Sequence, residues 1–194
     1  MRIQAKDPRL ISLMGEFMRS YLPGVRNRDG DTVDSYRHSI NLFVMYLESE
    51  HKVTILTMQA SDFSQKNIVG FMAWLKSERK NVATTINHRL SDLRGFCKYL
   101  YKKNALSLTE YEEIREISDV DDDRVIDFTW LSVNDVYLVL KSTESNREAI
   151  RDRFLLSLLY ESGARINEVL SLKLLDIKPT SHGEADVHFY GKGN

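Results

Sequence analysis

The residues best suited to chemistry follow a Gly-x-Arg-x-x-Glu pattern at positions 163–168. Gly163 permits backbone geometry that other residues resist, so a turn there can direct Arg165 out of the chain. The planar guanidinium of arginine keeps its charge and can grip two oxygens of a phosphate. Glu168 follows three residues later on the same helix face and can orient the arginine. The pattern predicts a phosphate site, with an ordinary surface ion pair as the alternative.

A second basic side chain, Lys192, lies between two glycines close to the end of the sequence. The alternating residues 185–190 before it predict a strand, so the glycines mark a turn at the strand end. Beside Arg165, this lysine would add a second positive charge to a phosphate site. On its own it is better explained as a solvated hairpin lysine.

Helical periodicity defines the elements that must position these residues. Four amphipathic helices are predicted: residues 10–21 closed by Pro23-Gly24, a helix capped by Asp31 or Thr32, a third opened by Asp62 or Ser64, and a fourth over residues 82–103. Together they predict a compact helical domain of about 100 residues. Residues 110–127 are strongly acidic, their first part helical and residues 119–127 an exposed linker. Periodicity returns over 133–140 and 154–159, and a short helix is predicted for residues 167–172.

Charge is divided unevenly although the net charge of the chain is −1. Residues 1–108 hold 17 Lys and Arg against 10 Asp and Glu, and residues 109–194 hold 10 against 18. A basic first half is typical of a nucleic-acid footprint confined to one domain, with two unequal solvated surfaces as the alternative. No apolar run approaches the roughly 20 residues of a membrane span. The single cysteine, Cys97, predicts a buried thiol in a reducing, cytoplasmic protein.

The order of these motifs resembles the tyrosine recombinase (phage integrase) family. The run Leu159–Leu172, with the Gly-Lys-Gly turn about twenty residues later, is similar to the first catalytic box and hairpin of that family. Segments 32–43 and 84–100 look like helices of its core-binding domain. The resemblance implies a mainly α fold, with a four-helix SAM-like core-binding domain over residues 1–108, an acidic helix and linker over 109–130, and a partial α+β catalytic domain over 131–194.

The resemblance also implies roles for the site residues. Arg165 would clamp the scissile phosphate and stabilise negative charge in the transition state, with Glu168 in support. Lys192 would protonate the departing 5′ oxygen or place a second charge on the phosphate. The family needs no metal or nucleotide cofactor. His182 and His188 have no third ligand near them in the sequence, so we expect no metal site.

Other parts of the family's machinery are not found in these 194 residues. None of the five histidines stands in a His-x-x-Arg box, and Tyr190, on the predicted strand, is no candidate nucleophile. We therefore expect that this chain, as a truncated recombinase, does not cleave DNA alone.

Double-stranded DNA is the predicted partner, through polar faces of two helices. On the fourth helix Thr84, Thr85, His88, Ser91 and Asp92 oppose the apolar stripe, flanked by Arg89 and Arg94, and on the second helix Arg37, His38 and Asn41 share one side. Short polar and basic side chains suit a major groove and its phosphates. Arg79-Lys80 and Lys102-Lys103 would add phosphate contacts. For each residue, an ordinary solvated face is the alternative.

These observations favour a DNA-binding fragment of a site-specific recombinase, whose full-length parent would self-associate on DNA. Two alternatives remain open at the level of sequence. One is a non-enzymatic DNA-binding regulator that uses the same helical module. The other is a helical protein-interaction module, which would have no affinity for phosphate.

Overall fold

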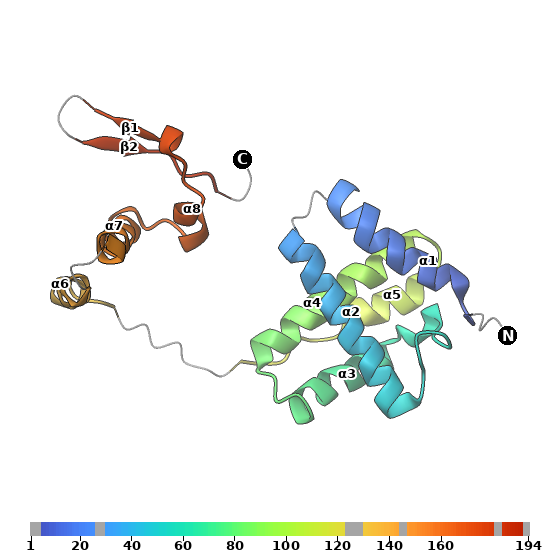
Figure 1. Ribbon diagram of the computed structural model, residues 1–194. Coiled ribbons are helices and arrows are strands. Elements are labelled where there is room, and N and C mark those ends of the chain that lie inside the picture. The colour runs from blue at the N-terminus through green and yellow to red at the C-terminus, as the bar shows by residue number, and fades with distance from the viewer. Residues whose placement is uncertain (1–4, 26–29, 123–129, 144–146, 181–183, 192–194) are drawn as a thin grey trace. The chain divides into compact units, whose positions relative to one another are not determined.

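The computed structural model describes residues 5–25, 30–122, 130–143, 147–180 and 184–191. The chain divides into two compact units, residues 1–124 and 125–194 (Figure 1). The first unit is helical, and the second combines helices with a two-stranded hairpin. The mainly helical fold class predicted from the sequence is confirmed.

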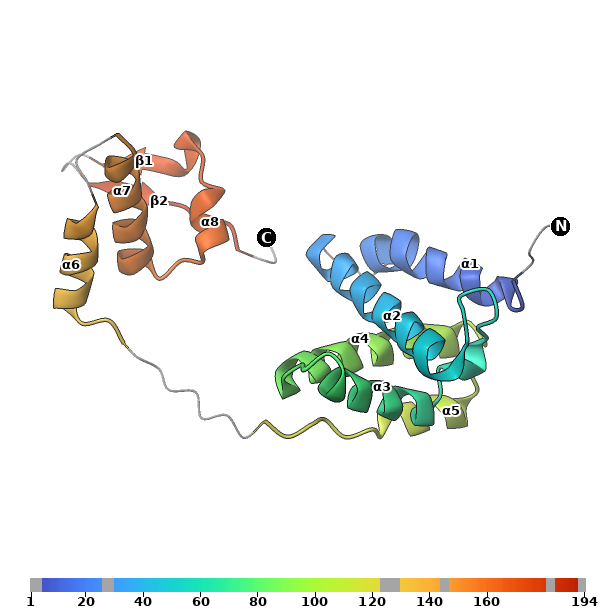
Figure 2. The ribbon, with the colours of Figure 1, turned by 60° about the horizontal axis from the view of Figure 1, so that its bottom comes forward.

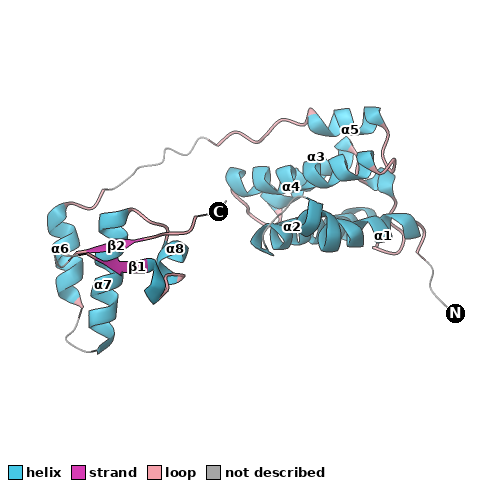
Figure 3. Ribbon diagram, turned by 90° about the horizontal axis from the view of Figure 1, so that it is seen from above, coloured by secondary structure: helices cyan, strands magenta, loops and turns pink. Residues whose placement is uncertain are grey.

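The helices of the first unit pack around α4. The described residues form α1 (Pro8–Glu16), α2 (Gly30–His51), α3 (Gln65–Ser77), α4 (Ala83–Lys102) and α5 (Leu108–Arg115). A π-helical stretch, Phe17–Val25, extends α1, and a 3-10 turn, Ala60–Asp62, precedes α3. Helix α4 contacts α2, α3 and α5, and Figure 3 shows α1 and α2 on one side of it and α5 on the other.

The helix ends test the predicted boundaries. Helix α4 begins and ends within one residue of the predicted range, and Ser64 caps α3 by accepting the Asn67 N–H at 3.3 Å. The predicted caps of α2 are wrong, because the helix already includes Gly30 and places Asp31 in its first turn. The π-helical stretch continues through the predicted closing pair Pro23-Gly24 and ends one residue later, at Val25. A wider π-helical turn accommodates the proline, which has no N–H to donate.

Aromatic side chains form the centre of the first unit. Phe96 of α4 lies 5.0 Å from Phe17 and 5.1 Å from Phe63 between ring centroids, both edge to face. Phe63 in turn lies 5.0 Å from Phe43 of α2. These rings are fully buried and join three helices through a loop. Cys97 lies beside them and is buried as predicted, and burial raises the pKa of its thiol, which leaves it unreactive.

Helix α5 belongs to the packed core of the first unit. Ser107 and Glu110 form a reciprocal capping box at its start, and Ile114 is fully buried against the core. The chain beyond α5 packs against this unit, with Ile117 buried and Asp119 exposed. Residues 123–127 of the predicted acidic linker lie outside the described part of the chain.

The second unit contains α6 (Val133–Ser142), α7 (Arg147–Ser162), α8 (Ile166–Leu170), a 3-10 turn (Leu174–Asp176), β1 (Ile177–Pro179) and β2 (Ala185–Val187). Helices α6 and α7 lie side by side (Figure 2). The strands pair antiparallel, with Ile177 opposite Val187 and Pro179 opposite Ala185. The strand predicted for residues 185–190 is therefore shorter, and α8 starts and ends before the predicted 167–172.

Candidate phosphate site and nucleic-acid interface

A glycine turn ends α7 and places Arg165 at the start of α8. Gly163 has φ +63°, a left-handed conformation that favours glycine. Its N–H donates to the carbonyl of Leu159 at 3.0 Å, and the N–H of Ala164 donates to the Ser162 hydroxyl at 3.2 Å. A Cβ at Gly163 would meet no atom within 4 Å, so the backbone conformation alone requires the glycine. The turn makes Arg165 the N-cap residue of α8.

Glu168 holds Arg165 through both carboxylate oxygens. Oε2 accepts the backbone N–H of Arg165 at 2.9 Å, and Oε1 accepts a hydrogen bond from Nη1 at 2.8 Å. The Arg165 side chain is 78% exposed and that of Glu168 15%. These bonds, first of all the one from the backbone N–H, hold the pKa of Glu168 below its ordinary value. The guanidinium has five N–H donors, so it can still bind a phosphate.

The hairpin after α8 returns to this pair. The N–H of His188 donates to the carbonyl of Asp176 at 2.9 Å, which ties the chain after β2 to the turn before β1. Farther along, a Cβ placed on Gly191 would lie 3.6 Å from Oε1 of Glu168. Tyr190 is 64% exposed and lies beyond β2, not on it as predicted. The structure thus brings Gly191 beside the Arg165–Glu168 pair, while Lys192 itself lies outside the described residues.

The polar side of α4 forms an exposed ridge in the first unit. We define the α4 ridge as Thr84, His88 and Ser91, which share one helix face and are all exposed. Thr85 is half-buried beside it. The prediction that Asp92 belongs to this face is wrong, because its side chain is only 8% exposed. The error arose because a helical wheel of α4 alone does not show that α2 covers one side of it.

Asp92 instead organises a polar cluster between α4 and α2. Its Oδ2 accepts hydrogen bonds from the hydroxyls of Ser35 at 3.0 Å and Ser39 at 2.5 Å. Because each hydroxyl donates its proton to Asp92, its lone pairs are left to accept from Nη1 of Arg89, at 3.4 and 3.1 Å respectively. The Nδ1 atom of His88 lies 3.6 Å from the same carboxylate oxygen. Sequence reasoning missed this cluster, although Ser35 and Ser39 stand one helical turn apart.

Other predicted DNA contacts lie at different places on the first unit. On α2, Arg37 and Asn41 are exposed, and Arg37 forms an ion pair with Asp34 in the preceding turn. Arg79 and Lys80 follow α3 in the turn that leads to α4, and both are exposed. The Arg79 guanidinium stands 5.7 Å from the ring centroid of Trp74, a cation–π distance. Of the predicted set, Arg89, His88 and the buried Asp92 join one cluster.

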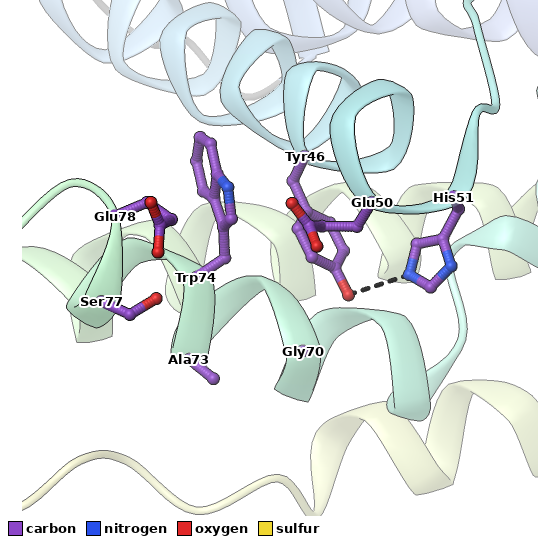
Figure 4. Close-up of a pocket in the computed structure, with 8 residues that line it drawn as sticks. All are labelled: Tyr46, Glu50, His51, Gly70, Ala73, Trp74, Ser77 and Glu78. Atoms are coloured by element: carbon purple, nitrogen blue, oxygen red, sulfur yellow. Dashed lines mark hydrogen bonds between the residues drawn. The ribbon is translucent and has the colours of Figure 1, made fainter.

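A groove between the end of α2 and α3 contains none of the predicted site residues (Figure 4). Tyr46 and His51 face each other there, with the Tyr46 oxygen 3.1 Å from Nε2 of His51. The Tyr46 hydroxyl lies against Gly70, where any Cβ would collide with it. Burial raises the pKa of Tyr46. Across the described residues, no three His, Cys, Asp or Glu side chains form a group that could hold a metal ion.

Comparison with known proteins agrees with this arrangement. The profile of the phage integrase N-terminal SAM-like domain matches residues 16–104. The chain is 26% identical to tyrosine recombinase XerC of Herpetosiphon aurantiacus over 179 residues, 90% of this chain and 54% of that protein. It is 29% identical to XerC of Treponema denticola over 170 residues, 86% of this chain and 53% of the relative. These similarities support the chain as a member of the tyrosine recombinase family.

The family relationship extends over most of the chain but only part of its relatives. Tyrosine recombinase XerD of Oceanobacillus iheyensis is 26% identical over 158 residues, 78% of this chain and 48% of that recombinase. The chain thus spans about half the length of the curated relatives it matches. Within the described segments, no helix has the length and apolar composition needed to cross a membrane.

Proposed function

We propose that these 194 residues are a DNA-binding portion of a site-specific tyrosine recombinase, whose full-length parent cuts and rejoins double-stranded DNA through a phosphotyrosyl intermediate. The observation that carries this proposal is the exposed Arg165–Glu168 pair with Gly191, the residue before Lys192 in the sequence, beside Glu168. The membership of the chain in the recombinase family supports it. The proposal calls for no metal or nucleotide cofactor.

Each residue of the site has a distinct role in the proposal. Arg165 binds the non-bridging oxygens of the scissile phosphate, where negative charge develops in the transition state. Glu168 holds the guanidinium from the less exposed side, because the Glu168 side chain is much less exposed than that of Arg165. Lys192 donates a proton to the departing 5′ oxygen or adds a second charge. Cleavage also needs a tyrosine in line with the phosphate, and we assign no such nucleophile among these residues.

The first unit supplies the remaining DNA contacts. The α4 ridge and Arg89 meet base edges and phosphates, Arg37 and Asn41 contribute from α2, and Arg79 and Lys80 bind phosphates at the turn before α4. The excess of Lys and Arg over Asp and Glu in residues 1–108 favours DNA contacts in the first unit. In the full-length parent we assign residues 1–108 to the core-binding domain, 109–130 to the acidic helix and linker, and 131–194 to the start of the catalytic domain. Such a parent would act in the cytoplasm and self-associate on its target.

Fluorescence anisotropy of a labelled duplex of arbitrary sequence tests the proposal. We expect binding at about 50 mM salt that weakens by several orders of magnitude at about 200 mM, because phosphate contacts release counterions. Strand breaks in the duplex after binding would show that a nucleophile has been overlooked. Absence of binding at low salt would overturn the proposal in favour of a protein-interaction module.

A further inference from the structure

Asn87 of α4 fastens the chain that leaves α5. Its Nδ2 donates to the carbonyl of Val120 at 2.8 Å, and its Oδ1 accepts the Val120 N–H at 2.8 Å. A side-chain amide thus satisfies both backbone groups of one residue, as a neighbouring strand would. Val120 also packs against the hydrophobic core. These bonds hold the segment after α5, called here the connector (residues 117–122), at a fixed point on α4.

Arg94 repeats this attachment two turns farther along the same side of α4. Its Nη1 donates to Oδ1 of Asp119 at 2.9 Å, and its Nη2 donates to the carbonyl of Ile117. Ile117 itself is 6% exposed. Four hydrogen bonds, to Ile117, Asp119 and Val120, therefore fix residues 117–120, a segment without regular secondary structure.

The attachment places this segment along one edge of the α4 ridge. On the opposite edge, Arg89 and Asp92 turn toward α2 and bond to its serines. Asn87 and Arg94 face the other way, so Thr84, His88 and Ser91 stand between α2 and the connector. The two sides of the ridge therefore differ in chemistry.

The two sides of the ridge differ in charge. On the connector side Asp119, Asp121 and Asp122 are all exposed, and Asp119 already pairs with Arg94. On the α2 side the Arg89 guanidinium lies 3.8 Å from the Asp92 carboxylate, so these two charges offset each other. A phosphate within a Debye length of the acidic segment, about 8 Å at physiological salt, is repelled, whereas the α2 side presents no such excess of negative charge.

We propose that Asn87 is a positioning residue that holds the acidic segment 119–122 against the α4 ridge, so that DNA is confined to the α2 side of that ridge. The inference rests on the proposed DNA binding and adds to it a boundary of the interface. A purely structural role for Asn87 would stabilise the fold without linking the acidic charge to DNA affinity.

Hydrogen exchange tests the attachment without DNA. In the intact chain the Val120 amide should be protected, and Asn87→Ala should remove that protection. Asn87→Asp keeps the acceptor for the Val120 N–H and should retain part of it, which guards against loss of folding in the alanine variant. Ser91→Ala, on the exposed ridge, should leave Val120 unchanged. Unprotected exchange of Val120 in the original chain would overturn the proposal.

Duplex affinity in a double-mutant cycle tests the electrostatic boundary. Asp121→Asn should raise affinity about twofold at low salt, because one unit charge at about 10 Å in water has that effect. In the Asn87→Ala background the same change should have a smaller effect, because Val120 is released while Arg94 still holds Asp119. Equal effects in both backgrounds would overturn the proposal while leaving the proposed function intact. If no variant bound DNA, the proposed function would fail, and this inference with it.

Discussion

Glu168 contacts Arg165 at two points, the backbone N–H at 2.9 Å and the guanidinium at 2.8 Å. One carboxylate therefore both caps α8 and orients the candidate phosphate ligand. Because the two tasks share one side chain, the direction of the Arg165 guanidinium is fixed relative to the axis of α8.

Glu168→Ala should release the N–H of Arg165 and destabilise the start of α8, as the loss of a cap does. Glu168→Gln keeps an acceptor for that N–H, as glutamine does in capping boxes, and should lose much less. Hydrogen exchange at the Arg165 amide measures both. Equal exchange rates in the alanine and glutamine variants would contradict the role of the cap.

Gly163→Ala should destabilise the second unit by about 1–2 kcal/mol, because alanine resists the φ of +63° found there. The surroundings leave space for a methyl group, so the effect isolates backbone strain. The matched control is Gly24→Ala, where a Cβ also meets no atom within 4 Å. We expect that control to be neutral or stabilising in urea denaturation, and a neutral Gly163→Ala would argue against the turn.

Asp92→Ala should lower the free energy of unfolding of the first unit by about 1–3 kcal/mol, since it leaves the buried Ser39 hydroxyl without its acceptor. Ser91→Ala, one position away but exposed, should change it by less than about 0.5 kcal/mol. In the double variant Asp92→Ala/Ser39→Ala, the two effects should not add, because both residues belong to one network. Additive losses would show that the two side chains act independently.

Stability of the first unit should fall in acid through Glu110. Hydrogen bonds from the Ser107 hydroxyl, and then from its N–H, hold the pKa of Glu110 below its ordinary value of 4.5. A carboxylate with a lowered pKa in the folded state stabilises the fold above the unfolded pKa, and the contribution is lost as pH falls through the folded one. Urea denaturation from pH 7 to below pH 4 should show this loss. Glu110→Gln should flatten the curve, and an unchanged curve would rule out this contribution.

Sequence patterns predicted the elements well where the apolar stripe of a single helix is enough to show which of its side chains are buried. The apolar stripe of α4 placed both of its ends within one residue, and the Arg165–Glu168 pairing follows from helical spacing. The assignment of Asp92 failed because its burial depends on α2, which a single-helix pattern does not include. The attachment of Val120 to Asn87 was not predicted either, since the segment after α5 has no periodicity and its fixed position depends on a long-range contact. Whether Lys192 joins the site stays a prediction from the motif.

The most direct test of the central claim is the salt dependence of duplex binding by the original chain and by Arg165→Ala. Each phosphate contact contributes about 0.9 to the slope of log affinity against log salt, so loss of Arg165 should make the slope less steep by about that amount. Arg151→Ala removes the same charge from α7, where Arg151 pairs with Asp152, and should leave the slope unchanged. If Arg165→Ala bound duplex DNA with the original slope and affinity, Arg165 would not be a phosphate ligand and the account of the site would be contradicted.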